Sequence, residues 1–134
     1  MRLGQARGAP TRQDRASQLH RDQQAAPKLR AAFPGVEQLR IDLSFEGGGT
    51  TTPVPQSHIL HPPARAYFSF PCPYCDCDGR FELAAAVHAA VENPSHRVEG
   101  VVECAGLRAS DYDPKPACHL RLRFALTAVC SPAH

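Results

Sequence analysis

The sequence predicts an α+β domain built mainly of antiparallel strands, with a zinc-ribbon-like pair of hairpins in a small sheet and one short helix. Three observations support this fold class. Apolar and polar residues alternate in several short segments, which is typical of strands with one buried face. Thirteen prolines and nine glycines among 134 residues indicate many turns and disfavour a helical bundle. Six cysteines, most of them at the ends of predicted strands, indicate a metal site between the hairpins.

The N-terminal part of the chain differs in composition from the rest. Residues 1–32 are predicted to form a disordered basic tail, and residues 33–134 a single metal-stabilised β-rich domain. The first 30 residues carry seven basic and two acidic side chains but almost no large apolar ones, so they cannot bury enough surface to offset chain entropy. A phosphate-seeking arm is the alternative role for this tail, because clustered arginines neutralise nucleic-acid phosphates.

The first predicted strand covers residues 39–46, where apolar and polar residues alternate without exception. It ends at three consecutive glycines. The proline-rich stretch that follows is expected to be a mobile connector, since proline cannot donate a hydrogen bond to a sheet. Two further strands, over residues 66–70 and 79–83, flank a short turn and therefore predict a hairpin.

The second half of the chain contains the predicted helix and two more strands. The sequence LAAAVHAAVE at residues 83–92 has high helix propensity, and the Asn-Pro step after it ends the helix. Residues 98–104 form a further strand. Alternation is clear again over residues 119–129, which make the last strand. The whole predicts an antiparallel sheet of about four or five strands.

The cysteines lie next to these strands. Each predicted hairpin brings two thiols together at its neck, and two such hairpins can supply four sulfur atoms to one tetrahedral Zn²⁺. Each of these cysteines also continues the apolar face of its strand, because residues two apart in a strand face the same side. The predicted metal ligands are Cys72, Cys77, Cys104 and Cys118.

Cys75 is an alternative to Cys77 as a ligand, because two residues between cysteines are a common zinc spacing. Cys77 is preferred, since the Asp78-Gly79 step after it can turn backbone N–H groups toward its sulfur. Cys130 is interpreted as an ordinary buried thiol without a role. Zinc is the expected metal, and iron remains the alternative because thiolates bind both metals.

A glutaredoxin-like thiol oxidoreductase is the alternative function, because residues 72–75 read CPYC, which is the active-site motif of glutaredoxins. In that fold the motif opens a helix, whose N-terminus lowers the pKa of the first thiol. Here the chain continues as DCDGRFEL, which reads as a turn and a strand. Disulfides are a further alternative, but the N-terminus lacks an export signal and cytosolic thiols stay reduced.

The segments CPYCDCDGRFEL, VEGVVECAGLR and ACHLRLRFAL resemble zinc-ribbon modules. They are similar in particular to a family of small, uncharacterised bacterial proteins with a CPY-x-DCDG-x-F-x-L signature and a later C-x-G pair. The similarity extends from Leu39 to Val129. It implies a metal site, and because the position of Cys75 need not be cysteine in that family, it favours Cys77 as the ligand.

The sequence therefore predicts a small, non-enzymatic zinc-binding domain with a structural Cys₄ site, which binds a protein or a nucleic acid. No segment approaches the roughly 20 uninterrupted apolar residues that span a bilayer, and the N-terminus lacks the apolar core of a secretory signal. A cytoplasmic location without membrane contact is expected. Neither the partner nor the oligomeric state follows from the sequence.

Overall fold

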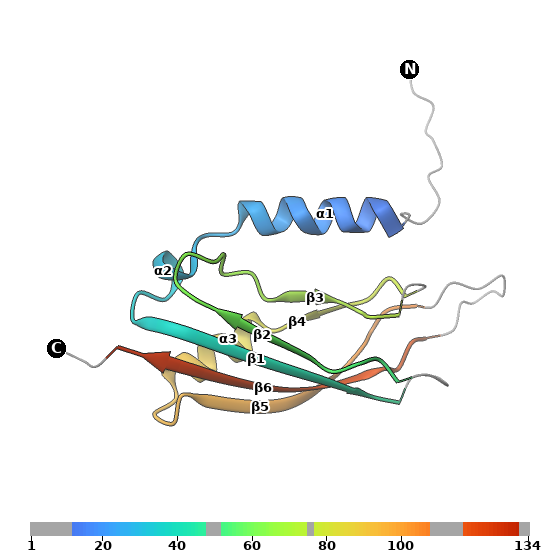
Figure 1. Cartoon of the computed structure of the whole chain (residues 1–134). Coiled ribbons are helices and arrows are strands. Elements are labelled where there is room, and N and C mark those ends of the chain that lie inside the picture. The colour runs from blue at the N-terminus through green and yellow to red at the C-terminus, as the bar shows by residue number, and fades with distance from the viewer. Residues whose placement is uncertain (1–11, 48–51, 75–76, 108–116, 132–134) are drawn as a thin grey trace, which may run out of the picture.

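The computed structural model describes residues 12–47, 52–74, 77–107 and 117–131. Within these ranges most elements are antiparallel strands accompanied by short helices, so the predicted α+β class is confirmed. None of these helices is long and apolar enough to cross a bilayer. The strands are β1 (Val36–Glu46), β2 (Gln56–Leu60), β3 (Ser69–Pro71), β4 (Arg80–Glu82), β5 (Arg97–Glu103) and β6 (Arg121–Cys130), and the helices are α1 (Arg12–Ala25), α2 (Leu29–Ala32) and α3 (Ala84–Glu92) (Figure 1).

The strands form two antiparallel sheets. The larger sheet has the order β2-β1-β6-β5, and the smaller one pairs β3 with β4. The first and the last strand of the chain are therefore neighbours, with Ile41 opposite Leu126 and Leu43 opposite Phe124. The smaller sheet lies between α1 and the larger sheet (Figure 1), and α3 contacts β5 and β6.

One face of the larger sheet is buried. Burying a large aliphatic side chain contributes about 1.5–3 kcal/mol, and a slip of one residue would turn this whole face toward water. The alternating pattern therefore fixes the register of β1 against β6. Its buried residues are Leu39, Ile41, Leu43 and Phe45 in β1 and Leu122, Phe124, Leu126 and Ala128 in β6. The smaller sheet adds Phe81 to this core, and α3 adds Val87 and Ala90.

Strand β2 lies in the segment for which the sequence predicts a mobile connector, so that prediction is wrong for residues 56–60. The strand pairs with β1, with Leu60 opposite Leu39 and His58 opposite Ile41. It is short and lies at the edge of the sheet, and its side chains are at best half-buried. The alternation of buried and exposed side chains in β2 is therefore too weak to predict a strand from the sequence. The strand is stabilised by its backbone pairing with β1.

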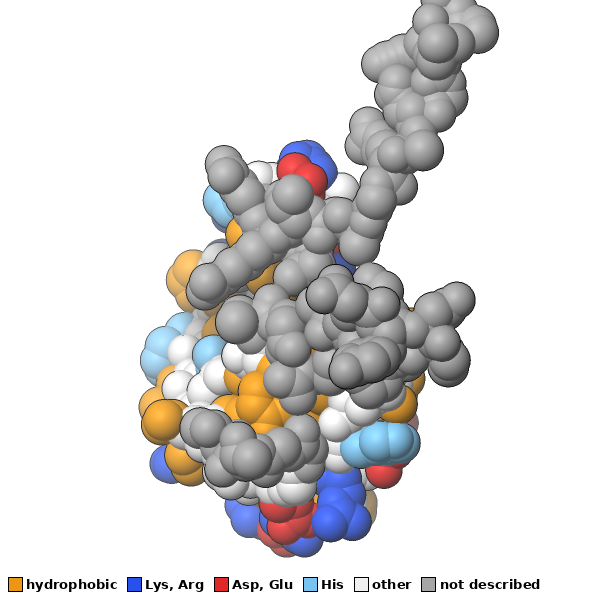
Figure 2. Space-filling view, turned by 90° about the vertical axis from the view of Figure 1, so that its right-hand side faces the viewer, with side chains coloured by type: hydrophobic (Ala, Val, Ile, Leu, Met, Phe, Trp, Pro, Cys, Tyr) orange, Lys and Arg blue, Asp and Glu red, His pale blue; other side chains and the backbone are white. Residues whose placement is uncertain are grey.

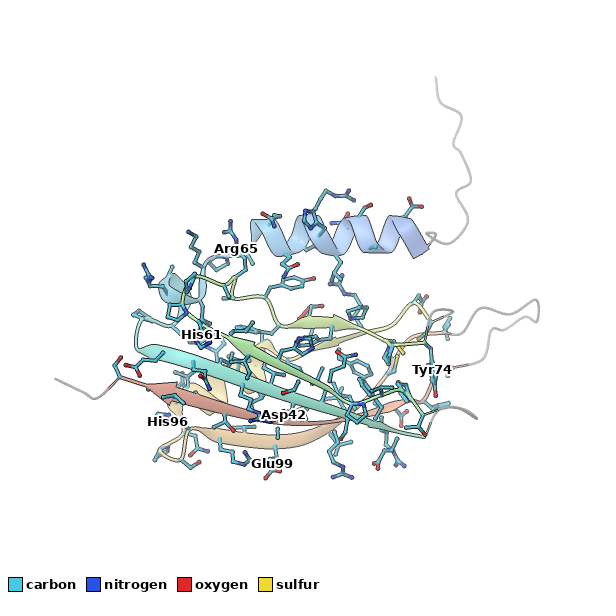
Figure 3. The ribbon with its side chains drawn as sticks, viewed as in Figure 1. Asp42, His61, Arg65, Tyr74, His96 and Glu99 are labelled. Atoms are coloured by element: carbon cyan, nitrogen blue, oxygen red, sulfur yellow. The ribbon has the colours of Figure 1, made fainter. Side chains whose placement is uncertain are left out.

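The predicted disordered tail covers residues 1–32, of which residues 1–11 lie outside the described part of the chain and residues 12–32 include two helices. Residues 12–25 form α1, and Leu29 in α2 is completely buried. The backbone N–H of Leu29 donates to the carbonyl of Ala64 at 2.7 Å, so the ordered core begins before the predicted boundary at residue 33. Figure 3 shows Arg65 near the C-terminal end of α1, where its guanidinium donates to the carbonyl of Ala26 at 2.9 Å.

Candidate metal centre

Four cysteine side chains meet where the smaller sheet lies against β5 and β6. Cys72 follows β3, Cys77 precedes β4, Cys104 follows β5 and Cys118 precedes β6. Their Sγ atoms all lie within 4.8 Å of one another. The four residues are buried, with 7%, 4%, 3% and 2% of their surface exposed in chain order. The structure thus brings together all four residues that the sequence predicts as ligands.

The distances between the sulfur atoms are compatible with a metal ion. The Sγ atoms of Cys72 and Cys118 are 3.8 Å apart, and those of Cys77 and Cys104 are 3.6 Å apart. Four sulfurs placed tetrahedrally at about 2.3 Å from a zinc ion would be about 3.8 Å apart. A disulfide needs about 2.05 Å, and each cysteine in the described ranges is free. The disulfide alternative therefore has no support among these residues.

Backbone N–H groups point at the sulfur atoms. Gly79 donates to Cys77 Sγ and Gly106 donates to Cys104 Sγ, each at 3.3 Å and each from two residues further along the chain. Such hydrogen bonds stabilise negative charge on a thiolate ligand. The predicted turn after Cys77, with an N–H directed at its sulfur, is confirmed.

The same two glycines pack against each other. A Cβ atom at Gly79 would overlap the Sγ of Cys104, and a Cβ atom at Gly106 would lie 2.5 Å from the Cα of Gly79. The carboxylate of Asp78 accepts a hydrogen bond of 2.7 Å from the N–H of Leu107. The two cysteine turns are thereby held together through their backbones. The repeated Cys-x-Gly pattern is the signal in the sequence, but the spacing alone does not reveal this contact.

Burial is the largest effect on the pKa of two of the thiols, Cys72 and Cys77. It raises the pKa of Cys72, against the lowering effect of a hydrogen bond from the backbone of Tyr74. It likewise raises the pKa of Cys77, to about 12. In Cys118 burial acts in the same direction, but hydrogen bonds from the backbone of Leu120 and from Cys77 outweigh it and lower the pKa. Figure 3 shows Tyr74 at the end of the molecule where this cluster lies.

Two of the four sulfurs, those of Cys77 and Cys104, thus accept a hydrogen bond from the backbone of a glycine two residues further along the chain. This shared local geometry is suited to two thiolate ligands of one metal ion.

Among the described residues, Cys130 is the one cysteine that does not belong to this group of four. Cys75, the alternative ligand, lies outside the described residues. Cys130 is half-buried at the end of β6, with its Sγ 3.8 Å from Nδ1 of His96.

No family model matches this chain, and no curated protein or solved structure matches it either. The similarity to zinc-ribbon proteins therefore remains a prediction. The fold and the cluster define a class of protein. It is a small α+β domain with four buried, convergent thiols that are compatible with a metal-binding site.

Proposed function

We propose that this chain is a non-enzymatic zinc-binding domain that acts as a protein-interaction module, with one Zn²⁺ held by Cys72, Cys77, Cys104 and Cys118. The observation that carries the proposal is the convergence of four buried sulfur atoms within 4.8 Å of one another. Four protein ligands complete a tetrahedral site and leave no position for a substrate. Such a site favours a structural role over a catalytic one.

The small size of the β3–β4 sheet supports a structural role for the metal. Each of its strands has three residues, and an isolated two-stranded hairpin is at best marginally stable in water. Cys72 and Cys77 come from this hairpin, whereas Cys104 and Cys118 adjoin the larger sheet. One ion held by all four would join the two sheets and supply folding free energy.

The charges on the open face of the larger sheet support a protein partner over a nucleic acid. Its arginines are paired with carboxylates, as in Arg40 with Asp42 at 3.0 Å and Arg123 with Glu46 at 3.2 Å. Figure 2 shows basic and acidic side chains next to each other at the lower end of that view. Attraction of phosphates requires an uncompensated basic surface.

The alternative, a glutaredoxin-like oxidoreductase, has less support. That fold needs a helix directly after the CPYC motif, whereas the chain here enters β4, and α3 begins only at Ala84. Burial raises the pKa of Cys72, although a reactive thiol needs a lowered one.

Metal analysis of the purified, untagged protein tests the proposal most directly. We expect one zinc per chain by elemental analysis and native mass spectrometry, and about two reactive thiols, since four of the six cysteines would be ligands. Iron in place of zinc would reveal itself by visible absorption, which zinc with its filled d shell lacks. A metal-free protein with a reactive, low-pKa Cys72 would favour the oxidoreductase instead.

Serine substitutions separate ligands from ordinary thiols. We expect Cys104→Ser and Cys118→Ser to unfold the domain, because the about 10–16 kcal/mol that structural zinc contributes is comparable to the whole stability of a domain. Cys130→Ser is the matched control and should change the melting temperature little. Equal melting temperatures for all three variants would contradict the proposal.

A further inference from the structure

We propose that β5 is a dimerisation edge, at which a second copy of this chain pairs antiparallel with β5 about a two-fold axis through Gly100. The two larger sheets would then form one continuous sheet. This proposal concerns a different surface from the cysteine cluster and does not depend on the identity of the metal.

The two edges of the larger sheet differ in how open they are to pairing. Prolines lie close to both ends of β2, at positions 53, 55, 62 and 63, and proline near an edge strand blocks further pairing. β5 has seven residues, contains no proline and exposes 48% of Val101. It forms the lower margin of the molecule in Figure 1. Among the described residues, β5 is therefore the edge that is more open to another strand. The carbonyl of Arg97 accepts contacts of 3.5 Å from the side chains of Asn93 and Ser95, and pairing with a partner strand would replace them.

The backbone of β5 fixes which residues face outward. The carbonyl of His96 accepts from Ala128, and the N–H of Cys104 donates to Leu120. Because the hydrogen-bonding direction alternates along an antiparallel strand, even-numbered residues between them face β6. The N–H and C=O groups of Arg97, Glu99, Val101 and Glu103 therefore point away from β6. A partner strand must pair its own odd-numbered residues with these.

Among the two-fold registers that meet this condition, only an axis at Gly100 pairs all seven residues of β5, and it brings opposite charges together. An axis at residue 98 also places Arg97 opposite the partner's Glu99, but it overlaps only residues 97–99 of the strand. An axis at residue 99 places Glu99 opposite the partner's Glu99, and an axis at residue 101 places Glu99 opposite the partner's Glu103. An axis at Gly100 places Arg97 opposite the partner's Glu103 and, by symmetry, Glu103 opposite the partner's Arg97. Like charges directly opposite each other destabilise a sheet, and opposite charges stabilise it. The strand is therefore self-complementary in this register.

The same register also matches the apolar residues. Val98 and Val102 are half-buried on the core side of the sheet, and the axis at Gly100 places Val98 opposite the partner's Val102. A two-fold axis perpendicular to the sheet continues the buried face of one copy into that of the other. The present partners of the charged residues are also exposed. Arg97 pairs with Glu99 at 3.5 Å and Glu103 with His119 at 3.1 Å. Exposed ion pairs of this kind contribute little to stability, so these side chains can exchange their partners for those of a second copy at little cost in free energy.

A charge-swap experiment tests this pairing in the full-length, metal-loaded protein. The readout is the dimer dissociation constant, from sedimentation velocity and native mass spectrometry over a micromolar concentration series. We expect a wild-type dimer, and Arg97→Glu or Glu103→Arg should each weaken it by about tenfold or more, because each creates two like-charged pairs. The double variant Arg97→Glu/Glu103→Arg restores both pairs and should recover affinity to within a few-fold.

Two further variants make the outcome decisive. Arg40→Glu makes the same charge change on the inner strand β1 and should leave the dimer unchanged. Val101→Pro removes an outward N–H without touching the ladder to β6, and should yield a monomer with an unchanged zinc content. A monomeric wild-type protein would overturn the proposal, and so would a dimer that survives all of these substitutions.

Discussion

A methyl group at position 79 would occupy the space of the Cys104 sulfur, so the close packing of the cysteine cluster requires glycine at this position. We expect Gly79→Ala to destabilise the domain by about 1–3 kcal/mol, because the Cys104 turn must shift to relieve the overlap. Zinc should also be lost more readily to a chelator. Denaturant titration and zinc retention measure the two effects.

Gly35→Ala is the matched control for this substitution. No atom lies within 4 Å of the Cβ that it would add, so its stability and zinc retention should match those of the wild type. If Gly79→Ala behaved like Gly35→Ala, the two cysteine turns would not be packed as closely as the structure has them.

The convergence of the four cysteines could be predicted because a strand has two faces. Cys118 shares a strand face with Leu120 and Leu122, and both leucines are completely buried. The alternation alone therefore predicts that the Cys118 side chain points toward the core. The contact between Gly79 and Gly106 could not be predicted in this way, since it joins residues 27 positions apart. The positive φ of His119, 57°, could not be predicted either, because only a few per cent of non-glycine residues adopt such a φ, even though histidine is enriched among them.

At the scale of elements, local patterns revealed those strands that alternate strongly by themselves. β1 and β6 are of this kind, because both have a complete buried face. β2 was missed, since an edge strand next to prolines gains its stability from the strand beside it. The prediction of one helix omitted α1 and α2, because α1 is mostly polar and α2 has four residues.

Two truncations should separate the contributions of α1 and α2. Deleting residues 1–25 removes α1, whose ion pair between Asp22 and Arg80 spans 3.6 Å at the surface; exposed pairs contribute about 0–1 kcal/mol, so the melting temperature should change little. Deleting residues 1–32 also removes the fully buried Leu29, which should cost about 2–5 kcal/mol as judged from large-to-small core substitutions.

Thermal melts of both truncated proteins measure this difference, and Leu29→Ala in the full chain provides an independent check. Equal losses of stability in the two truncations would show that α1 contributes more than its surface contacts indicate. A full-length Leu29→Ala variant as stable as wild type would contradict the placement of this residue in the core.

At the scale of the whole molecule, the cysteine cluster lies where the two sheets meet, so metal binding and folding should be coupled. A ligand that binds the folded chain stabilises it according to its concentration and affinity. Protons compete with zinc for the thiolates, and burial raises the pKa of Cys77 to about 12 and that of Cys72 as well. On the proposed function, a zinc ion that binds these thiols at neutral pH would therefore have to displace at least these two protons.

The stability of the zinc-loaded protein should consequently fall as the pH is lowered from about 8 to about 5. A metal-bound thiolate has a pKa far below the value of about 8.5 of an unfolded thiol, so its contribution is complete above that value and is lost on acidification. Carboxylates act at lower pH, as the hydrogen bond from Ser57 lowers the pKa of Asp42 from 3.8. Thermal melts and native mass spectrometry across this range should show stability and bound zinc declining together, and a flat stability profile with full zinc occupancy down to about pH 5 would contradict the coupling.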